Sequence, residues 1–252
     1  MCLIAFAWHA HPEYPLILAA NRDEFHARPS EAMHWWEDPP DLLAGRDLEA
    51  GGTWLGVSRS GRCAAVTNYR EELQEHHGSR SRGELVISFV QSEQTASGFC
   101  TSIDLDPYRG VSLLAADRVA MGYVSNRGDS ARSLAPGIYG LSNASLDTPW
   151  AKVMRSKAVL EILTQQEKVD AELLFRLLAD REPAATDDYA GTGLSPEMAR
   201  AISAPFIAAS EYGTRCSTVL LIGRSGRVEM HERRFDSAGR PAGNASFEFE
   251  LD

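Results

Sequence analysis

The second residue of the chain is a cysteine, and it stands directly before the apolar run LIAFAW. Enzymes that trim the initiator methionine generally act before a small residue, so Cys2 can become the first residue and carry a thiol and a free α-amine together. An α-amine has a pKa of about 7.7–8, so it could act as general base for the thiol beside it. Cys2 could equally be a small apolar side chain that opens a buried strand.

Four polar residues, Asn21, Arg22, Asp23 and Glu24, follow the next apolar run, LILAA. If they end a strand, side-chain alternation sends Asn21 and Asp23 to one face and Arg22 and Glu24 to the other. An arginine beside a thiol lowers the thiol's pKa, and a carboxylate can orient an ammonium group. A solvated turn with a local ion pair would also explain these residues.

Three further polar clusters fall where strands are expected to end. They are VTNYR at 66–70, GLSNASLDTPW at 140–150 and YGTRCSTVLL at 212–221. An asparagine at such a position can offer its NH₂ group to a developing oxyanion, although turn chemistry would account for each cluster alone. Their shared position predicts that they gather around one rim of a sheet.

The elements that would hold these clusters are mostly strands. Two buried strands are expected at 2–8 and 16–21, and three hairpins at 53–69, 111–126 and 218–235, with an alternating edge strand at 247–251. Residues 27–52, rich in Pro and Gly, are expected to form a long surface loop, and His76 and His77 an exposed one. Many hairpins with few helices favour an α+β domain.

Four helices are expected, each from a start signal. Ser81 and Glu84 have the spacing of a capping box, and Asp147 or Thr148 could cap a helix that has Pro149 in its first turn. The other two are expected to begin at Asp170 and at the Ser-Pro pair at 195–196.

Composition excludes several classes of function. The chain has 252 residues and a formal net charge of -10, which disfavours nucleic acid and anionic membranes as partners. No apolar run approaches the length of a membrane span, and the start lacks the features of a signal peptide. The four cysteines form no C-x-x-C pair and have no histidine at zinc-ligand spacing. We expect a cytoplasmic protein without a metal; the oligomeric state stays open.

The same residues, taken in order, resemble the NRDE proteins, the family related to the Transport and Golgi organisation protein 2. The matching segments run across nearly the whole chain: MC at 1–2, NRDE at 21–24, GGTWLG at 51–56, TNYR at 67–70, SRGELV at 81–86, LSNASLDTPWAKV at 141–153 and YGTRCSTVLL at 212–221. The resemblance implies one domain over 1–252 with the N-terminal-nucleophile hydrolase fold, a four-layer αββα sandwich.

A more distant resemblance is to the cysteine branch of that fold, the penicillin V acylases and bile salt hydrolases. It implies that Cys2 is the nucleophile and that Arg22 and Asp23 support it, although another alignment puts Asn21 and Glu24 in those two places. It also implies that Asn143 and a backbone N–H near Asn68 and Tyr69 form the oxyanion hole. Arg215 would be a late catalytic arginine.

The resemblance therefore implies a hydrolase that cleaves a non-peptide C–N amide bond through an acyl group on Cys2, with a small acyl or amide compound as ligand and no cofactor. The alternative is a non-catalytic carrier or chaperone for haem or a lipid or acyl-CoA ligand. Haem could in principle involve Cys2, His9, His11 and the HWW segment at 34–36.

Overall fold

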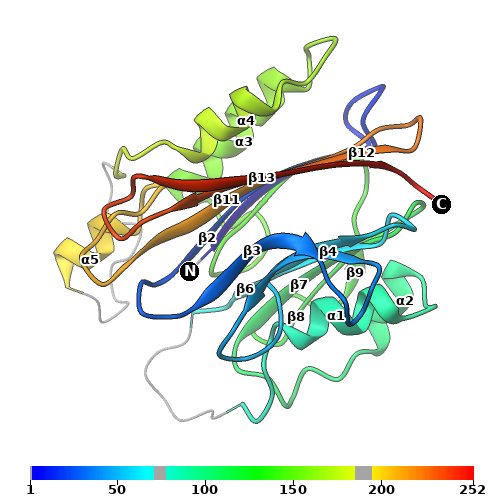
Figure 1. Ribbon diagram of the computed structural model, residues 1–252, viewed down its shortest axis with the longest axis horizontal. Coiled ribbons are helices and arrows are strands. Elements are labelled where there is room, and N and C mark those ends of the chain that lie inside the picture. The colour runs from blue at the N-terminus through cyan, green and yellow to red at the C-terminus, as the bar shows by residue number, and fades with distance from the viewer. Residues whose placement is uncertain (1, 71–77, 185–194) are drawn as a thin grey trace.

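Two antiparallel sheets face each other in the computed structural model, which describes residues 2–70, 78–184 and 195–252 (Figure 1). The first sheet has the order β10-β1-β2-β11-β12-β13 and the second the order β3-β4-β5-β6-β7-β8-β9. The strands of the first sheet are β1 (Cys2–Trp8), β2 (Leu16–Phe25), β10 (Gly137–Leu141), β11 (Tyr212–Ile222), β12 (Arg227–Phe235) and β13 (Pro241–Glu250). Those of the second are β3 (Ser30–Trp35), β4 (Leu42–Asp47), β5 (Leu55–Ser58), β6 (Cys63–Asn68), β7 (Val111–Ala116), β8 (Met121–Ser125) and β9 (Arg132–Ser133).

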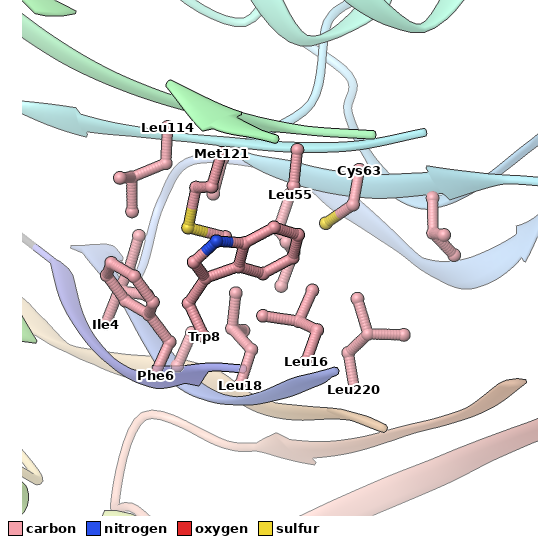
Figure 2. Packing of buried hydrophobic residues seen from close by; sticks show 14 of the residues in the cluster. Ile4, Phe6, Trp8, Leu16, Leu18, Leu55, Cys63, Leu114, Met121 and Leu220 are labelled. Atoms are coloured by element: carbon pink, nitrogen blue, oxygen red, sulfur yellow. The ribbon is translucent and has the colours of Figure 1, made fainter. Parts of the chain in front are cut away.

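The largest apolar core lies between the two sheets (Figure 2). Ile4, Phe6 and Trp8 alternate along β1 toward this core, and they meet Leu55 and Leu114 from the second sheet. The residues between them, such as Ala5 and Ala7, face the opposite way and are also buried. Because β1 is covered on both faces, its sequence is a continuous apolar run rather than an alternating one.

Helices cover the outer face of each sheet (Figure 1). Helices α1 (Glu84–Gln91) and α2 (Ala96–Ser102) pack on the second sheet, while α3 (Ala151–Leu163) and α4 (Ala171–Leu178) pack on the first. A short helix, α5 (Pro196–Ala201), lies beside the start of β11. The expected four-layer αββα sandwich is therefore confirmed.

The three expected hairpins are present as β5–β6, β7–β8 and β11–β12, and β13 is the edge strand of the first sheet. The expectation of a long loop over 27–52 is wrong, because this segment contains β3 and β4. Its polar residues hide the strand pattern: β3 is an edge strand, and its register with β4 shifts between Glu31 and His34. The pair His76 and His77 lies outside the described residues.

Two of the four expected helix caps are confirmed. Asp170 accepts a hydrogen bond from the N–H of Glu172, and Ser195 accepts one from the N–H of Met198. The capping box of Ser81 and Glu84 does not form, because α1 begins after Gly83 without a side-chain cap.

The expected cap on α3 is also wrong. This helix begins after Trp150, again without a side-chain cap. Asp147 instead accepts hydrogen bonds from the N–H of Gly140 and from Lys157 Nζ, at 2.8 and 2.7 Å. None of the helices in the described part of the chain is long and apolar enough to cross a membrane.

Candidate active site

Cys2 begins β1 and lies level with Arg22 on the neighbouring strand. The register of β1 and β2 pairs Cys2 with Arg22, and Arg22 is paired in turn with Cys216 on β11. Ile4 and Phe6 point into the core between the sheets, so side-chain alternation puts Cys2 on this same face. Cys2 is half-buried and lines a cavity of about 430 Å³ at this end of the sandwich.

The guanidinium group of Arg22 is fixed by two contacts. Its Nη2 atom lies 2.8 Å from Asp47 Oδ2, and its carbon Cζ lies 4.3 Å from the centre of the Trp54 ring. Arg28 Nε shares the same carboxylate oxygen at 2.6 Å. Arg22 is only 5% exposed, and among the described residues its Nη1 atom has no hydrogen-bond acceptor. A buried, oriented cation with an unused donor therefore stands in the cavity wall beside Cys2.

The Cys2 thiol experiences opposing influences. Its burial raises its pKa above the ordinary value, and the negative charge of Asp23 adds to the rise. A hydrogen bond with the backbone of Asp23 and the positive charge of Arg22 lower the pKa, but the balance remains upward. A thiol with a raised pKa is protonated at neutral pH, so it needs a general base before it can attack.

Asn21 faces the helical layer rather than the cavity. Its Nδ2 atom donates to the carbonyl oxygens of Leu178 and Pro205, both at 2.9 Å, and its Oδ1 atom accepts from Ser217 Oγ at 2.6 Å. These bonds tie β2 to β11 and to the end of α4. The expected role of Asn21 in substrate binding is therefore corrected to a structural one.

Asp23 also lies on the helical side of β2, yet it reaches the edge of the cavity. Its Oδ1 atom accepts a 2.6 Å hydrogen bond from Thr214 Oγ1, and its carbonyl accepts one from the Tyr212 hydroxyl at 2.7 Å. Burial raises the pKa of Asp23 to about 6, against the lowering effect of the positive charge on Lys152. Above that pH the carboxylate is ionised and can hold an ammonium group.

Asn143 is buried, follows β10 beside β1, and connects the two sheets near Cys2 without lining the cavity itself. Its Nδ2 atom donates to the carbonyl oxygen of Asn68 at 2.8 Å, which connects the end of β10 to the end of β6. Ser142 Oγ donates to the carbonyl oxygen of Cys2 at 2.8 Å, and Thr67 Oγ1 donates to the carbonyl oxygen of Ser142 at 2.9 Å. Because an amide NH₂ has two hydrogens, Asn143 retains one donor beside the one used on Asn68.

Two other expectations need correction. The N–H of Tyr69 donates to the carbonyl oxygen of Gly110 at 2.8 Å, so it does not serve as an oxyanion donor. Arg215 does not line the cavity: its Nη1 atom donates to the carbonyl oxygens of Phe25, His26 and Arg28. The cause is a bulge in β11 between Thr214 and Cys216, which turns Arg215 out of the regular alternation.

The predicted gathering of polar clusters at one rim is otherwise present. Arg22, Asp23 and Glu24 line the cavity together with Cys2 and Asn68. Neither of the two alignments of the NRDE segment describes the site fully, because one residue from each pair lies on the inner face of β2. Arg22 and Glu24 share the inner face of β2, while Asp23 contributes from the other face through its backbone and carboxylate.

Three residues of the candidate site escaped prediction from the sequence: Arg28, Asp47 and Trp54. All three belong to the cavity lining, and they orient Arg22 directly or through the shared Asp47 carboxylate. The segment GRDLEAGGTWLG contains two of them, but we expected its first part to be an irregular loop. Recognition of β4 would have placed Asp47 at a strand end beside the other clusters.

Of the residues named for haem, His9 lies far from Cys2 and His11 is buried among contacts of its own. Cys2 begins the seven-residue strand β1 and His9 follows its last residue, Trp8, so the two lie about 20 Å apart at the usual rise per residue. His11 is 2% exposed, and its ring nitrogens contact the carbonyl oxygen of Gln166 and the N–H groups of Glu13 and Tyr14. No cluster of three or more His, Cys, Asp or Glu side chains suited to a metal occurs within the described ranges.

Comparison with known proteins places the chain in a family. The profile of the family "Transport and Golgi organisation 2" matches residues 1–237. The Transport and Golgi organization 2 homologs of mouse and human are each 37% identical to this chain, and each alignment covers 92% of both proteins. The Drosophila melanogaster protein of the same name is 26% identical over 92% of this chain and 91% of its own.

Solved structures of similar shape identify the fold. The Caenorhabditis elegans ortholog of N-acylethanolamine-hydrolyzing acid amidase matches with a TM-score of 0.52 and 10% identity, over 87% of this chain and 92% of that one. The C2A mutant of conjugated bile acid hydrolase from Clostridium perfringens matches with a TM-score of 0.59 and 7% identity, over 100% of this chain and 92% of that one. The chain belongs to the Transport and Golgi organisation 2 family and has the fold of the N-terminal-nucleophile hydrolases.

Proposed function

We propose that this protein is an N-terminal cysteine hydrolase that cleaves a non-peptide C–N amide bond through an acyl group on Cys2. The observation that carries the proposal is the position of Cys2 in a cavity beside Arg22 and Asp23. Two proteins of similar fold are named as an amidase and a hydrolase, and the second was solved with alanine in place of the cysteine at its position 2. The cavity volume of about 430 Å³ suits a small molecule.

The first step requires that Met1 is removed, so that Cys2 carries a free α-amine. The amine takes the thiol proton, and sulfur attacks the carbonyl carbon of the amide. The tetrahedral intermediate collapses to a thioester as the C–N bond breaks, and the departing amine receives the proton from the ammonium group. Water then attacks the thioester, which releases the carboxylic acid and restores the thiol. The carboxylate of Asp23 would hold the ammonium form.

The oxyanion would be bound by Asn143 Nδ2 and the N–H of Asn68. The N–H of Tyr69 points toward β7, and the N–H of Val66 points the other way, to the carbonyl oxygen of Trp54. Successive N–H groups of a strand alternate in direction, so Asn68 directs its N–H to the same side as Val66. Strand β5 begins only at Leu55, which leaves this N–H facing the segment that lines the cavity. Fixed donors of this kind stabilise the charge that develops in the transition state.

A non-catalytic carrier is the second candidate, since the same cavity could hold a ligand without cleaving it. The two candidates differ in what they require of Cys2. Hydrolysis needs a reactive Cys2 thiol with a free amine, whereas a carrier needs neither. The position of Cys2 favours hydrolysis, because of the four cysteines Cys2 is the one that lines the cavity, beside Arg22 and Asp23.

Alkylation of the native protein with iodoacetamide tests the proposal, with the modified cysteines mapped by mass spectrometry. The chain supplies its own controls, since Cys63, Cys100 and Cys216 are buried and burial raises the pKa of each. We expect Met1 to be absent and Cys2 to be labelled well before the other three. Retained Met1, or labelling of Cys2 no faster than of Cys63, would refute the proposal.

A further inference from the structure

The wall of the cavity carries a charge opposite in sign to that of the chain. Five arginines and four carboxylates line it, whereas the chain as a whole has a formal net charge of -10. Two of the arginines, Arg22 and Arg28, share the Asp47 carboxylate on the β2 and β4 side. The other three, Arg80, Arg82 and Arg109, come from the segments before α1 and before β7. The four carboxylates belong to β2, β4 and the residues just after β4, so the excess positive charge lies on the side of Arg80, Arg82 and Arg109.

The segment before α1 is held against the cavity by two glycines. A Cβ atom at Gly52 would lie 2.7 Å from the carbonyl carbon of Gly83, and one at Gly83 would lie 2.9 Å from the nitrogen of Thr53. Only residues without side chains permit this approach, which explains the GGT and SRGE motifs physically. Since Ser81 does not cap α1, its side chain is available to the cavity that it lines.

The arginines at the rim are held in place by several contacts. Arg80 pairs with Glu84 at 2.8 Å, and Arg82 Nη1 donates to the carbonyl oxygen of Gly110 at 3.1 Å. A bridge between Arg80 and Tyr108 keeps the two segments side by side. Arg109 is exposed, and no carboxylate within the described ranges pairs with it. The guanidinium group of Arg109 therefore stands at the rim beside Arg82 with its charge open to a ligand.

A second and independent observation comes from the cavity wall beside Cys2. Arg22 is 5% exposed, and its buried Nη1 atom has no acceptor within the described part of the chain. A buried donor without an acceptor costs free energy, and an anionic ligand in the cavity would supply the missing acceptor. The unused donor and the rim arginines favour the same class of ligand.

We propose that the compound cleaved at Cys2 carries an anionic oxygen group, a carboxylate, sulfonate or phosphate, which binds to Arg82 and Arg109 at the rim. The inference rests on the proposed function, because it assigns the substrate class of that same cavity. Arginine suits this role, since its guanidinium group can form two parallel hydrogen bonds to such a group.

The test compares two alkylating reagents that differ in charge, iodoacetate and iodoacetamide, on the native full-length protein. The ratio of their rates at Cys2 is divided by the same ratio for N-acetylcysteine, so any change in the reactivity of the thiol itself cancels. We expect iodoacetate to be favoured about three- to tenfold at low salt, and the preference to fall as salt screens the arginines. R82Q and R109Q should each lower the ratio about two- to fourfold, and the double variant should abolish the preference.

The matched control is R118Q. Arg118 is exposed and lies by Trp8 and Leu16, at the far end of the sandwich from Cys2, so this substitution should leave both rates unchanged. An unchanged ratio in the double variant, with normal labelling by iodoacetamide, would overturn the substrate class and leave the proposed function intact. Failure of iodoacetamide to label Cys2 in the unaltered protein would instead overturn both.

A second arm distinguishes the sources of the anion. Inorganic phosphate and acetate are added separately, and protection of Cys2 from iodoacetamide is measured for each. Protection by phosphate that is lost in the double variant indicates a phosphate group on the substrate, and the same result with acetate indicates a carboxylate. Absence of protection by both ions at saturating concentration would contradict binding at the rim.

Discussion

Substitution of Asp23 by Asn should make the protein more stable above about pH 6 while it disables Cys2. Burial raises the pKa of Asp23 from its ordinary 3.8 to about 6. The folded chain therefore binds this proton more tightly than the unfolded chain does. Its contribution to stability is fully present below about pH 3.8 and is lost as the pH rises through about 6. Asparagine has no such proton to lose, and its Oδ1 atom can still accept the hydrogen bond from Thr214.

The size of the effect follows from the two pKa values. A shift of about two units is worth about 3 kcal/mol when the whole titration is included. Between about pH 4.5 and about pH 8, the unfolding free energy of the unaltered protein should fall by about 2 kcal/mol relative to that of D23N. Urea unfolding of both proteins at several pH values measures this difference, because all other titrating groups are common to the two.

The reactivity of Cys2 should fall in D23N although the stability of the protein rises. Without the carboxylate, nothing at this position of β2 can hold the ammonium form of the Cys2 amine. We expect D23N to reduce alkylation of Cys2 by iodoacetamide at neutral pH while the fold persists. If the unfolding free energies of the two proteins change with pH in the same way, Asp23 does not have a raised pKa. If iodoacetamide alkylates Cys2 in D23N as fast as in the unaltered protein, Asp23 does not support the thiol.

Three other substitutions test the positioning of the site. Asp47→Asn should cost about 3 kcal/mol of unfolding free energy and slow Cys2 alkylation, because it leaves a buried Arg22 without its counter-charge; stability unchanged in urea would contradict this. Gly52→Ala should lower the unfolding free energy by about 2 kcal/mol, because its Cβ would meet the backbone of Gly83. An unchanged unfolding free energy in urea would show that the two segments are not in contact. Thr214→Val removes a hydrogen bond that lowers the pKa of Asp23, so the pH at which the loss of stability becomes complete should rise above about 6. An unchanged pH would show that the hydrogen bond does not act on Asp23.

Local rules predicted a substantial part of the fold. Alternation along β2 correctly separated Asn21 and Asp23 from Arg22 and Glu24, because a strand has a fixed period of two. The hairpins were found from turn residues, and the caps at Asp170 and Ser195 from their spacing. The order of the four layers was predicted from the family resemblance, because the local sequence pattern does not determine which distant strands pair.

The remaining features depend on contacts between distant segments. Arg215 points away from the cavity because of a bulge in β11, and the local sequence pattern does not predict this bulge. The N–H of Tyr69 is not an oxyanion donor because it donates to the carbonyl oxygen of Gly110, whereas the N–H of Asn68 points the other way. Asp47 was missed because β4 is recognisable only once it pairs with β3 and β5.

The mass of the N-terminal peptide of the purified protein tests the central claim most directly. Catalysis by Cys2 requires that Cys2 is the first residue and that its α-amine is free, because this amine is the base for the thiol. We therefore predict an N-terminal peptide that lacks Met1 and carries an unmodified amine on Cys2. A peptide that retains Met1 would contradict catalysis by Cys2.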